Sequence, residues 1–296
     1  RREEAAAVYP ATFEYHAPTS VEEALSLLER YGGEAKILAG GQSLIPVMKL
    51  RVAQPGALVD INRIPGLDGL VEEGGQLRIG ALVRHKTCER SELLHGRYGT
   101  LGATAPQVSD PIVRNLGTVC GSVAHADPQG DWASALLATG AEIVAQSSSG
   151  TRAIPIGEFM LGPFMTVLEP TELITEVRVP DPGERAGGTY LKLERKVGDF
   201  ATAGVAVHVS MDNGTIGRAG IALTGVGATN IKATAAEESL AGAEPTDEAI
   251  AAAAALAAGA ADPIGDHRGS VEYKRNVVRV FTERGLRTAV EAARAA

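Results

Sequence analysis

The feature that most constrains this chain is the run Pro180-Asp181-Pro182-Gly183-Glu184, which neither a helix nor a strand accommodates. Before it, short aliphatic segments alternate with glycine loops and helical patterns. After it, extended segments come first and helical segments follow. A chain of 296 residues is also longer than one average domain. We therefore expect two domains, over residues 9–180 and residues 185–292.

The N-terminal half has the pattern of an α/β unit. Ser20 and Glu23 have the spacing of a capping box, which predicts a short helix that stops at Gly32-Gly33. A second helix is expected over residues 131–139, ending at Gly140. Short aliphatic or β-branched stretches predict the extended segments, which we place at residues 35–39, 57–61, 77–82, 117–124 and 173–179.

The C-terminal half has strands first and helices afterwards, which is the order of an α+β unit. Asp212-Asn213-Gly214 is a hairpin signal between two alternating stretches. The strands are expected at residues 190–193, 203–211 and 216–224. The helices are expected at residues 232–240, 247–258 and 270–292.

Two glycine loops carry the chemistry of the N-terminal half. The first, Ala39-Gly40-Gly41-Gln42-Ser43, follows an extended segment, and its adjacent glycines leave backbone N–H groups unshielded for a diphosphate. Taken alone, such a loop is also compatible with a plain tight turn. The second, Gly117-Thr118-Val119-Cys120-Gly121-Ser122, adds two hydroxyl groups. Neither has the Gly-x-x-x-x-Gly-Lys-Ser/Thr or Gly-x-Gly-x-x-Gly spacing, which argues against a P-loop ATPase and a Rossmann dehydrogenase.

Composition excludes several other classes. The formal charge is −8 and no Lys/Arg cluster is present, so nucleic-acid binding is not expected. Cys88 and Cys120 are the only cysteines, too few for a disulfide framework or an iron–sulfur cluster. The apolar run over residues 249–258 is too short to span a bilayer, and the Arg-Arg-Glu-Glu start is not followed by a signal-like core. We expect a cytoplasmic protein.

Seven collinear segments resemble the FAD-binding medium subunits of the xanthine dehydrogenase and carbon monoxide dehydrogenase family, the molybdenum hydroxylases. The resemblance extends from about residue 9 to residue 289. The segments are residues 39–51, 58–61, 79–81, 113–118, 125–128, 195–201 and 268–273.

The resemblance implies an α+β protein with two parts. The N-terminal part is an FAD-binding domain of the vanillyl-alcohol-oxidase (PCMH) type in two α/β subdomains. The smaller C-terminal α+β domain has an antiparallel sheet with helices. The resemblance also implies FAD as the cofactor, with no catalytic residue and no metal ligand on this chain. The implied cofactor-binding residues are Ala39, Gly40, Gly41, Gln42, Ser43, Leu44, Thr118, Val119, Cys120, Gly121, Ser122, Asp131, Ile174 and Lys192.

The implied function is electron transfer within a complex. A large partner subunit oxidises substrate at a molybdenum-pterin centre, and a small partner carries [2Fe–2S] clusters whose electrons pass through this chain's FAD to an external acceptor. A dimer of heterotrimers is the implied assembly. The substrate stays open among carbon monoxide, aldehydes, purines and other N-heterocycles. Two other functions remain as alternatives. The chain could be a stand-alone PCMH-type flavin oxidase or reductase, or an assembly protein without cofactor.

Four residues have more than one interpretation. Relatives carry glycine at the position of Cys120, where a positive φ would cost about 1–2 kcal/mol for a residue with a Cβ. His125 and Asp127 are expected to order a turn, with metal ligation as the alternative. In relatives the aromatic position of Phe200 lies near the isoalloxazine, and core packing is the alternative.

Overall fold

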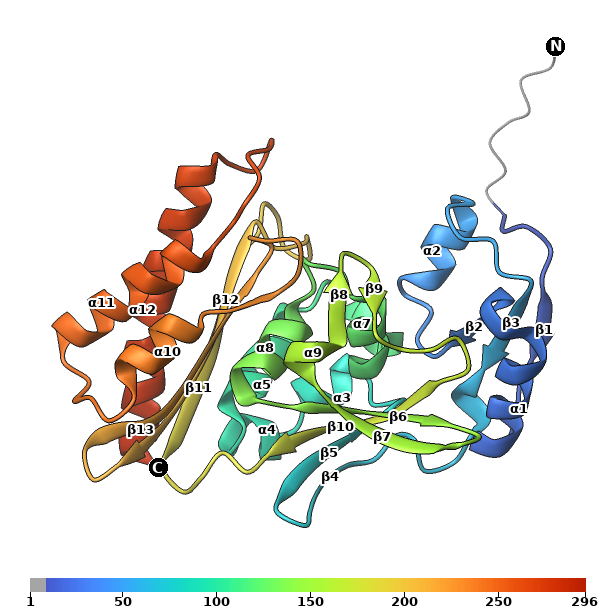
Figure 1. Ribbon diagram of the computed structural model, residues 1–296, viewed down its shortest axis with the longest axis horizontal. Coiled ribbons are helices and arrows are strands. Elements are labelled where there is room, and N and C mark those ends of the chain that lie inside the picture. Colours follow the sequence, from blue (N-terminus) through green and yellow to red (C-terminus); the bar gives the residue numbers. More distant parts are fainter. Residues whose placement is uncertain (1–8) are drawn as a thin grey trace.

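The computed structural model describes residues 9–296 (Figure 1). Its three larger sheets succeed one another along its longest axis, and each contributes to a separate cluster of buried apolar side chains. This mixture of helices and sheets is the α+β architecture expected from the sequence. Residues 1–8, which include the Arg-Arg-Glu-Glu start, lie outside the described residues. Among residues 9–296, no helix combines the length and apolarity needed to cross a membrane.

The first subdomain is a parallel sheet flanked by helices, at the right of Figure 1. Its strands run in the order β1-β3-β2. Helix α1 begins where the Ser20 hydroxyl accepts a hydrogen bond from the Glu23 N–H, and it ends at Gly32 with φ +54°, so the predicted helix is confirmed. The elements are β1 (Glu14–His16), α1 (Val21–Tyr31), η1 (Gly32–Glu34), β2 (Ala35–Leu38), α2 (Leu44–Lys49), β3 (Ala57–Asp60) and η2 (Ile61–Arg63).

The second subdomain is an antiparallel sheet in the order β4-β5-β10-β6-β7, with helices on one side. Helix α8 is buried along its whole length, and Gly140 ends it with φ +71°, as predicted. The strands are β4 (Leu70–Glu73), β5 (Gln76–Gly80), β6 (Glu142–Ser147), β7 (Gly150–Pro155) and β10 (Leu173–Pro180), with a small hairpin of β8 (Met160–Gly162) and β9 (Met165–Thr166). The helices are α3 (His85–Glu89), α4 (Glu92–Gly96), α5 (Gly99–Thr104), η3 (Ala105–Gln107), α6 (Pro111–Leu116), α7 (Val119–His125), α8 (Asp131–Thr139) and α9 (Ile156–Phe159).

The predicted strand and loop over residues 117–124 is wrong, because this segment is helix α7. The Thr118 Oγ1 atom accepts a hydrogen bond of 3.0 Å from the Gly121 N–H, which caps the helix start. Only Thr118 keeps an extended pairing, an isolated bridge to Arg84. The cap outweighs the strand preference of the Thr and Val side chains.

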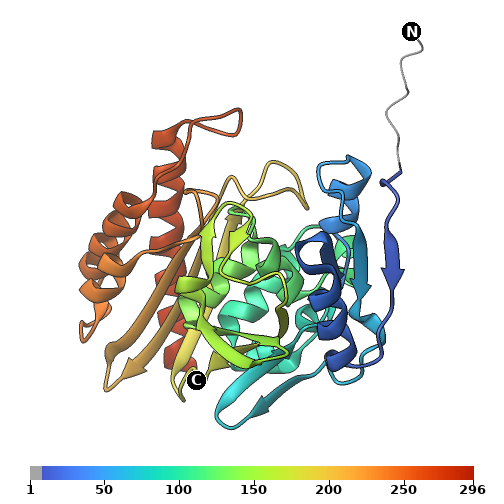
Figure 2. The same ribbon diagram turned by 45° about the vertical axis from the view of Figure 1, so that its right-hand side comes forward.

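The C-terminal domain is a four-stranded antiparallel sheet whose outer face is covered by three helices (Figures 1 and 2). The hairpin turn is as predicted, with Asn213 and Gly214 at φ +48° and +89°. Val205, Val207 and Val209 belong to the core under the helices, whereas Ala206, which points to the opposite face, joins the central core. The elements are β11 (Ala186–Leu193), β12 (Ala203–Asp212), β13 (Thr215–Thr224), β14 (Ile231–Lys232), α10 (Thr234–Leu240), α11 (Asp247–Ala260) and α12 (Val271–Ala295).

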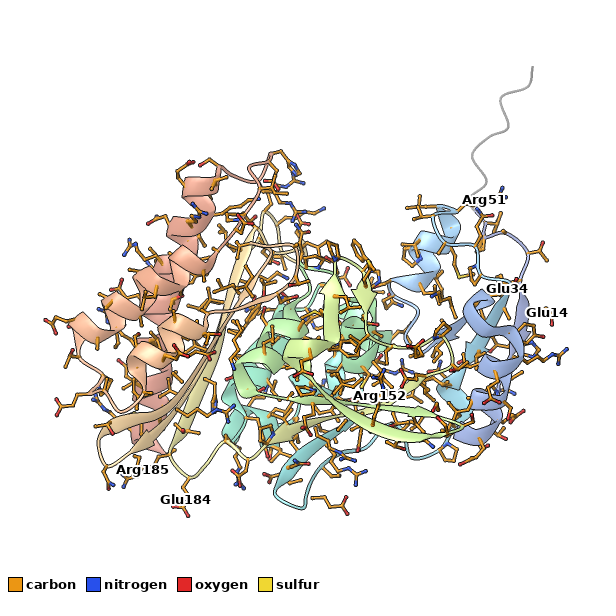
Figure 3. The ribbon with its side chains drawn as sticks, in the orientation of Figure 1. Glu14, Glu34, Arg51, Arg152, Glu184 and Arg185 are labelled. Atoms are coloured by element: carbon orange, nitrogen blue, oxygen red, sulfur yellow. The ribbon has the colours of Figure 1, made fainter. Side chains whose placement is uncertain are left out.

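Helix α8 contacts this sheet almost backbone to backbone. A Cβ atom on Gly220 of β13 would overlap the Ala138 carbonyl group of α8. The linker between β10 and β11 lies at the lower edge of the molecule, where Figure 3 shows Glu184 and Arg185. The two halves are therefore joined by close packing as well as by the chain.

Candidate cofactor site

The two glycine loops lie against each other. A Cβ atom on Gly40 would overlap the carbonyl oxygen of Leu116 and would lie 2.7 Å from the Cα atom of Gly117. Only glycine at position 40 allows so close an approach of two backbones. The loops therefore form one continuous surface.

The first loop presents a run of free backbone donors. Within residues 9–296, the N–H groups of residues 40–44 donate to no protein acceptor. Gly41 has φ +71°, and the Gln42 side-chain amide donates to the Gly40 carbonyl over 3.2 Å. The first bond of the following helix runs from the Ile45 N–H to the Gly41 carbonyl, 3.0 Å. Consecutive free amides of this kind favour an anion such as a diphosphate.

The second loop is the first turn of helix α7, and most of its donors are used. The N–H groups of Val119, Gly121 and Ser122 donate to Val83, Thr118 Oγ1 and the Thr118 carbonyl. Among the described residues, the N–H groups of Thr118 and Cys120 have no protein acceptor. The hydroxyl of Thr118 accepts the capping bond, so its own proton is still available to a ligand.

Cys120 has an ordinary helical backbone, and the strain considered for this position does not arise. Its side chain is 3% exposed, and its thiol approaches the carbonyl groups of Ile79 and Gly80 at 3.7 Å. Burial raises the pKa of the Cys120 thiol, so the group stays protonated. A small buried residue with a weak donor fits these observations.

His85 packs against the second loop at Gly117. Its N–H donates to the Gly117 carbonyl over 3.0 Å, and a Cβ on Gly117 would lie 2.8 Å from the imidazole ring. The indole N–H of Trp132 donates to His85 Nδ1 over 2.9 Å. Burial, with Arg114 and Arg84 nearby, lowers the pKa of His85 to about 3, so the ring is neutral and can accept this bond. His85 stands alone in the sequence without a motif, so no sequence signal identifies it as a support of this loop.

Asp131 and Lys192 form a buried ion pair between the two domains. The Asp131 carboxylate accepts hydrogen bonds from Lys192 Nζ at 3.0 Å and from the Tyr190 hydroxyl at 2.7 Å. Lys192 Nζ also donates to the Gln107 carbonyl over 2.9 Å. Burial raises the pKa of the Asp131 carboxyl, and the Lys192 charge opposes that shift. Asp131 does not cap helix α8, since Gly130 occupies the cap position.

Three further residues that the sequence singled out lie in a core, on the surface and in a turn. Ile174 is a core residue of β10, beside a bulge in the pairing with β6. Phe200 is 50% exposed, so the core-packing alternative is wrong, and its place near a flavin stays a prediction. Asp127 orders the turn before α8 by accepting a bond of 2.9 Å from the Gln129 N–H, as predicted. Residues 9–296 contain no group of three or more His, Cys, Asp or Glu side chains arranged to hold a metal ion.

Comparison with known families agrees with this architecture. Residues 11–182 match the FAD binding domain in molybdopterin dehydrogenase, and residues 188–289 match the CO dehydrogenase flavoprotein C-terminal domain. The chain belongs to the family of FAD-binding medium subunits of the molybdenum hydroxylases, which includes carbon monoxide and xanthine dehydrogenases. The resemblance stated from the sequence is confirmed.

Individual relatives match over nearly the whole chain. The carbon monoxide dehydrogenase medium chain of Hydrogenophaga pseudoflava is 42% identical over 95% of this chain and 98% of its own length. The 6-hydroxypseudooxynicotine dehydrogenase complex subunit alpha of Paenarthrobacter nicotinovorans is 39% identical over 96% and 97%. The solved carbon monoxide dehydrogenase from Hydrogenophaga pseudoflava that lacks the Mo-pyranopterin moiety has a chain that superposes with a TM-score of 0.92 at 44% identity, over 96% of this chain and 99% of that one.

Proposed function

We propose that this chain binds FAD across the two glycine loops and serves as the electron-transfer subunit of a molybdenum hydroxylase complex. The observation that carries the proposal is the contact between Gly40 and Gly117, which brings the free N–H groups of both loops to one surface. Bound FAD would supply the redox chemistry, accepting electrons from a [2Fe–2S] partner and releasing them to an external acceptor.

In this proposal each part of the chain has a separate task. The free N–H groups of residues 40–44, Thr118 and Cys120 bind the diphosphate, and the other residues of 39–44 and 118–122 shape the two loops. Asp131 and Lys192, with Ile174, lie beside the ribityl chain and the flavin, and the buried ion pair stabilises one arrangement of α8 against β11. The domains comprise residues 9–180 and 185–292, so this pair joins them across the junction.

We further propose two kinds of partner subunit, a large one with the molybdenum-pterin cofactor and a small one with [2Fe–2S] clusters, in a dimer of heterotrimers. Support comes from the names of the relatives, which describe a medium chain and a subunit of a dehydrogenase complex. The two buried cysteines of this chain are too few to ligate a cluster of its own.

The test is a titration of the purified chain with FAD, followed by visible spectroscopy and chemical reduction. We expect a yellow, reducible protein that turns over none of the family's substrates until both partners are added. A protein that refuses FAD would refute the proposal. Substrate turnover by the isolated chain would instead favour the stand-alone flavin oxidase or reductase.

A further inference from the structure

A series of side-chain hydrogen bonds connects the two glycine loops through backbone carbonyl groups. The Asn62 Nδ2 atom donates to the carbonyl of Ala39 over 2.8 Å, and its Oδ1 atom accepts from Arg84 Nη2 over 2.5 Å. Arg84 Nη1 in turn donates to the carbonyl of Leu116. The connected carbonyl groups therefore belong to the residues immediately before Gly40 and Gly117.

The orientation of the Asn62 amide is determined by its surroundings. Asp60 Oδ1 accepts bonds from both the backbone N–H and the side-chain Nδ2 of Asn62, at 2.9 and 2.6 Å. The other Asp60 oxygen accepts from the Tyr15 hydroxyl over 2.6 Å. If the amide were flipped, its oxygen would face two acceptors and its nitrogen would face a guanidinium group. Only the observed orientation satisfies every group.

Arg84 uses its donors on neutral oxygens. Among residues 9–296, no carboxylate lies within ion-pair distance of its guanidinium group, whereas Arg78 and Arg114 each have a carboxylate partner. The planar guanidinium presents two N–H groups at a fixed separation, which suits two acceptors on different segments. A lysine side chain ends in a single nitrogen and cannot place two donors at this fixed separation.

We propose that Asn62 and Arg84 are positioning residues, which fix the distance and angle between the two loops and thereby the fit of the FAD diphosphate. In a trans peptide the C=O and the following N–H point in opposite directions. Holding the Ala39 carbonyl therefore aims the Gly40 N–H away from Asn62, and holding the Leu116 carbonyl fixes the surface on which Gly40 rests. This inference rests on the proposed FAD site.

The test compares FAD dissociation constants of full-length variants, measured by titrating the flavin-free protein. We expect Arg84→Ala, Arg84→Lys and Asn62→Ala each to weaken FAD binding about tenfold, with circular dichroism unchanged. The double variant Asn62→Ala/Arg84→Ala should lose no more than one single variant, because both changes break the same connection. The ³¹P resonances of bound FAD should shift in these variants.

Arg97→Ala is the matched control, since Arg97 pairs with Glu72 and Asp181 away from the loops. It should leave the dissociation constant and the ³¹P resonances unchanged. Wild-type affinity in Arg84→Lys would overturn the inference, because charge alone would then suffice, and so would additive losses in the double variant. If Arg84→Ala does not fold, the FAD dissociation constant of Asn62→Ala still tests the inference. Failure of the wild type to bind FAD overturns the proposed function as well.

Discussion

The two glycine loops do one proposed task by different physical means. The first loop depends on backbone freedom: Gly41 has a positive φ, Gly40 touches another backbone, and the start of α2 has no side-chain cap. The second loop depends on support, with Thr118 capping α7 and His85 underneath. We therefore expect FAD binding by the first loop to be weakened by any side-chain atom added to its glycines. The second loop should instead be sensitive to changes in the residues that support it.

The largest effect is expected from Gly40→Ala. The new Cβ would overlap the Leu116 carbonyl, so the loops must move apart and their amides can no longer bind one diphosphate. FAD affinity should fall by about 100-fold or more in an equilibrium titration. Gly33→Ala is the control, because a Cβ there meets no atom within 4 Å. Equal affinities for the two variants would contradict the close contact.

Acidification should weaken the support of the second loop. Burial lowers the pKa of His85 to about 3 and that of His208 to about 4, whereas both have the ordinary value of 6.5 when unfolded. As pH falls below 6.5, the unfolded chain binds protons that the folded protein refuses, so stability decreases. At about pH 4.5 each histidine should cost about 2–3 kcal/mol of unfolding free energy.

The measurement is chemical denaturation at a series of pH values. His85→Gln should show a shallower loss of stability between pH 6.5 and pH 4.5 than the wild type, because it has one buried imidazole fewer. The variant His267→Gln, at an exposed position, should keep the wild-type slope. An unchanged slope in His85→Gln would mean that the imidazole is not held neutral.

Gly41→Ala separates backbone strain from cofactor binding. At φ +71° an alanine should cost about 1–2 kcal/mol of stability. Gly74→Ala isolates the backbone strain, with φ +63° and no neighbour within 4 Å of the new Cβ, whereas the Cβ of Gly41→Ala would also lie 2.7 Å from the Ile45 side chain. Gly41→Ala should therefore lose more stability in denaturant than Gly74→Ala, and it alone should weaken FAD binding. Equal FAD affinities would remove Gly41 from the site.

The smallest effect is expected from Cys120→Gly, which gives the second loop a glycine pair like that of the first loop. A glycine inside α7 should cost about 1 kcal/mol of stability. FAD affinity should change by less than about threefold, because the backbone at this position is already helical. A clear gain in affinity would show that the second loop also depends on backbone freedom.

Local signals in the sequence predicted local structure well. The capping box at Ser20, the stop at Gly140 and the hairpin at Asn213-Gly214 all appear as expected, because each depends on residues that are neighbours in the chain. The short helices α3 to α6 carried no usable pattern, since five or six residues give too few turns for a period to show. Residues 117–124 were misjudged because one capping bond decides between helix and strand.

The sequence by itself determined the class of protein, through its resemblance to a known family. It also determined the order of the two halves and the positions of both glycine loops, because these follow from residue types and their spacing. Only the tertiary structure decided that the loops touch, that Asp131 pairs with Lys192 and that Asn62 and Arg84 connect the loops. The physical reason is distance along the chain. Contacts between remote residues depend on how sheets and helices pack, and no local pattern encodes that packing.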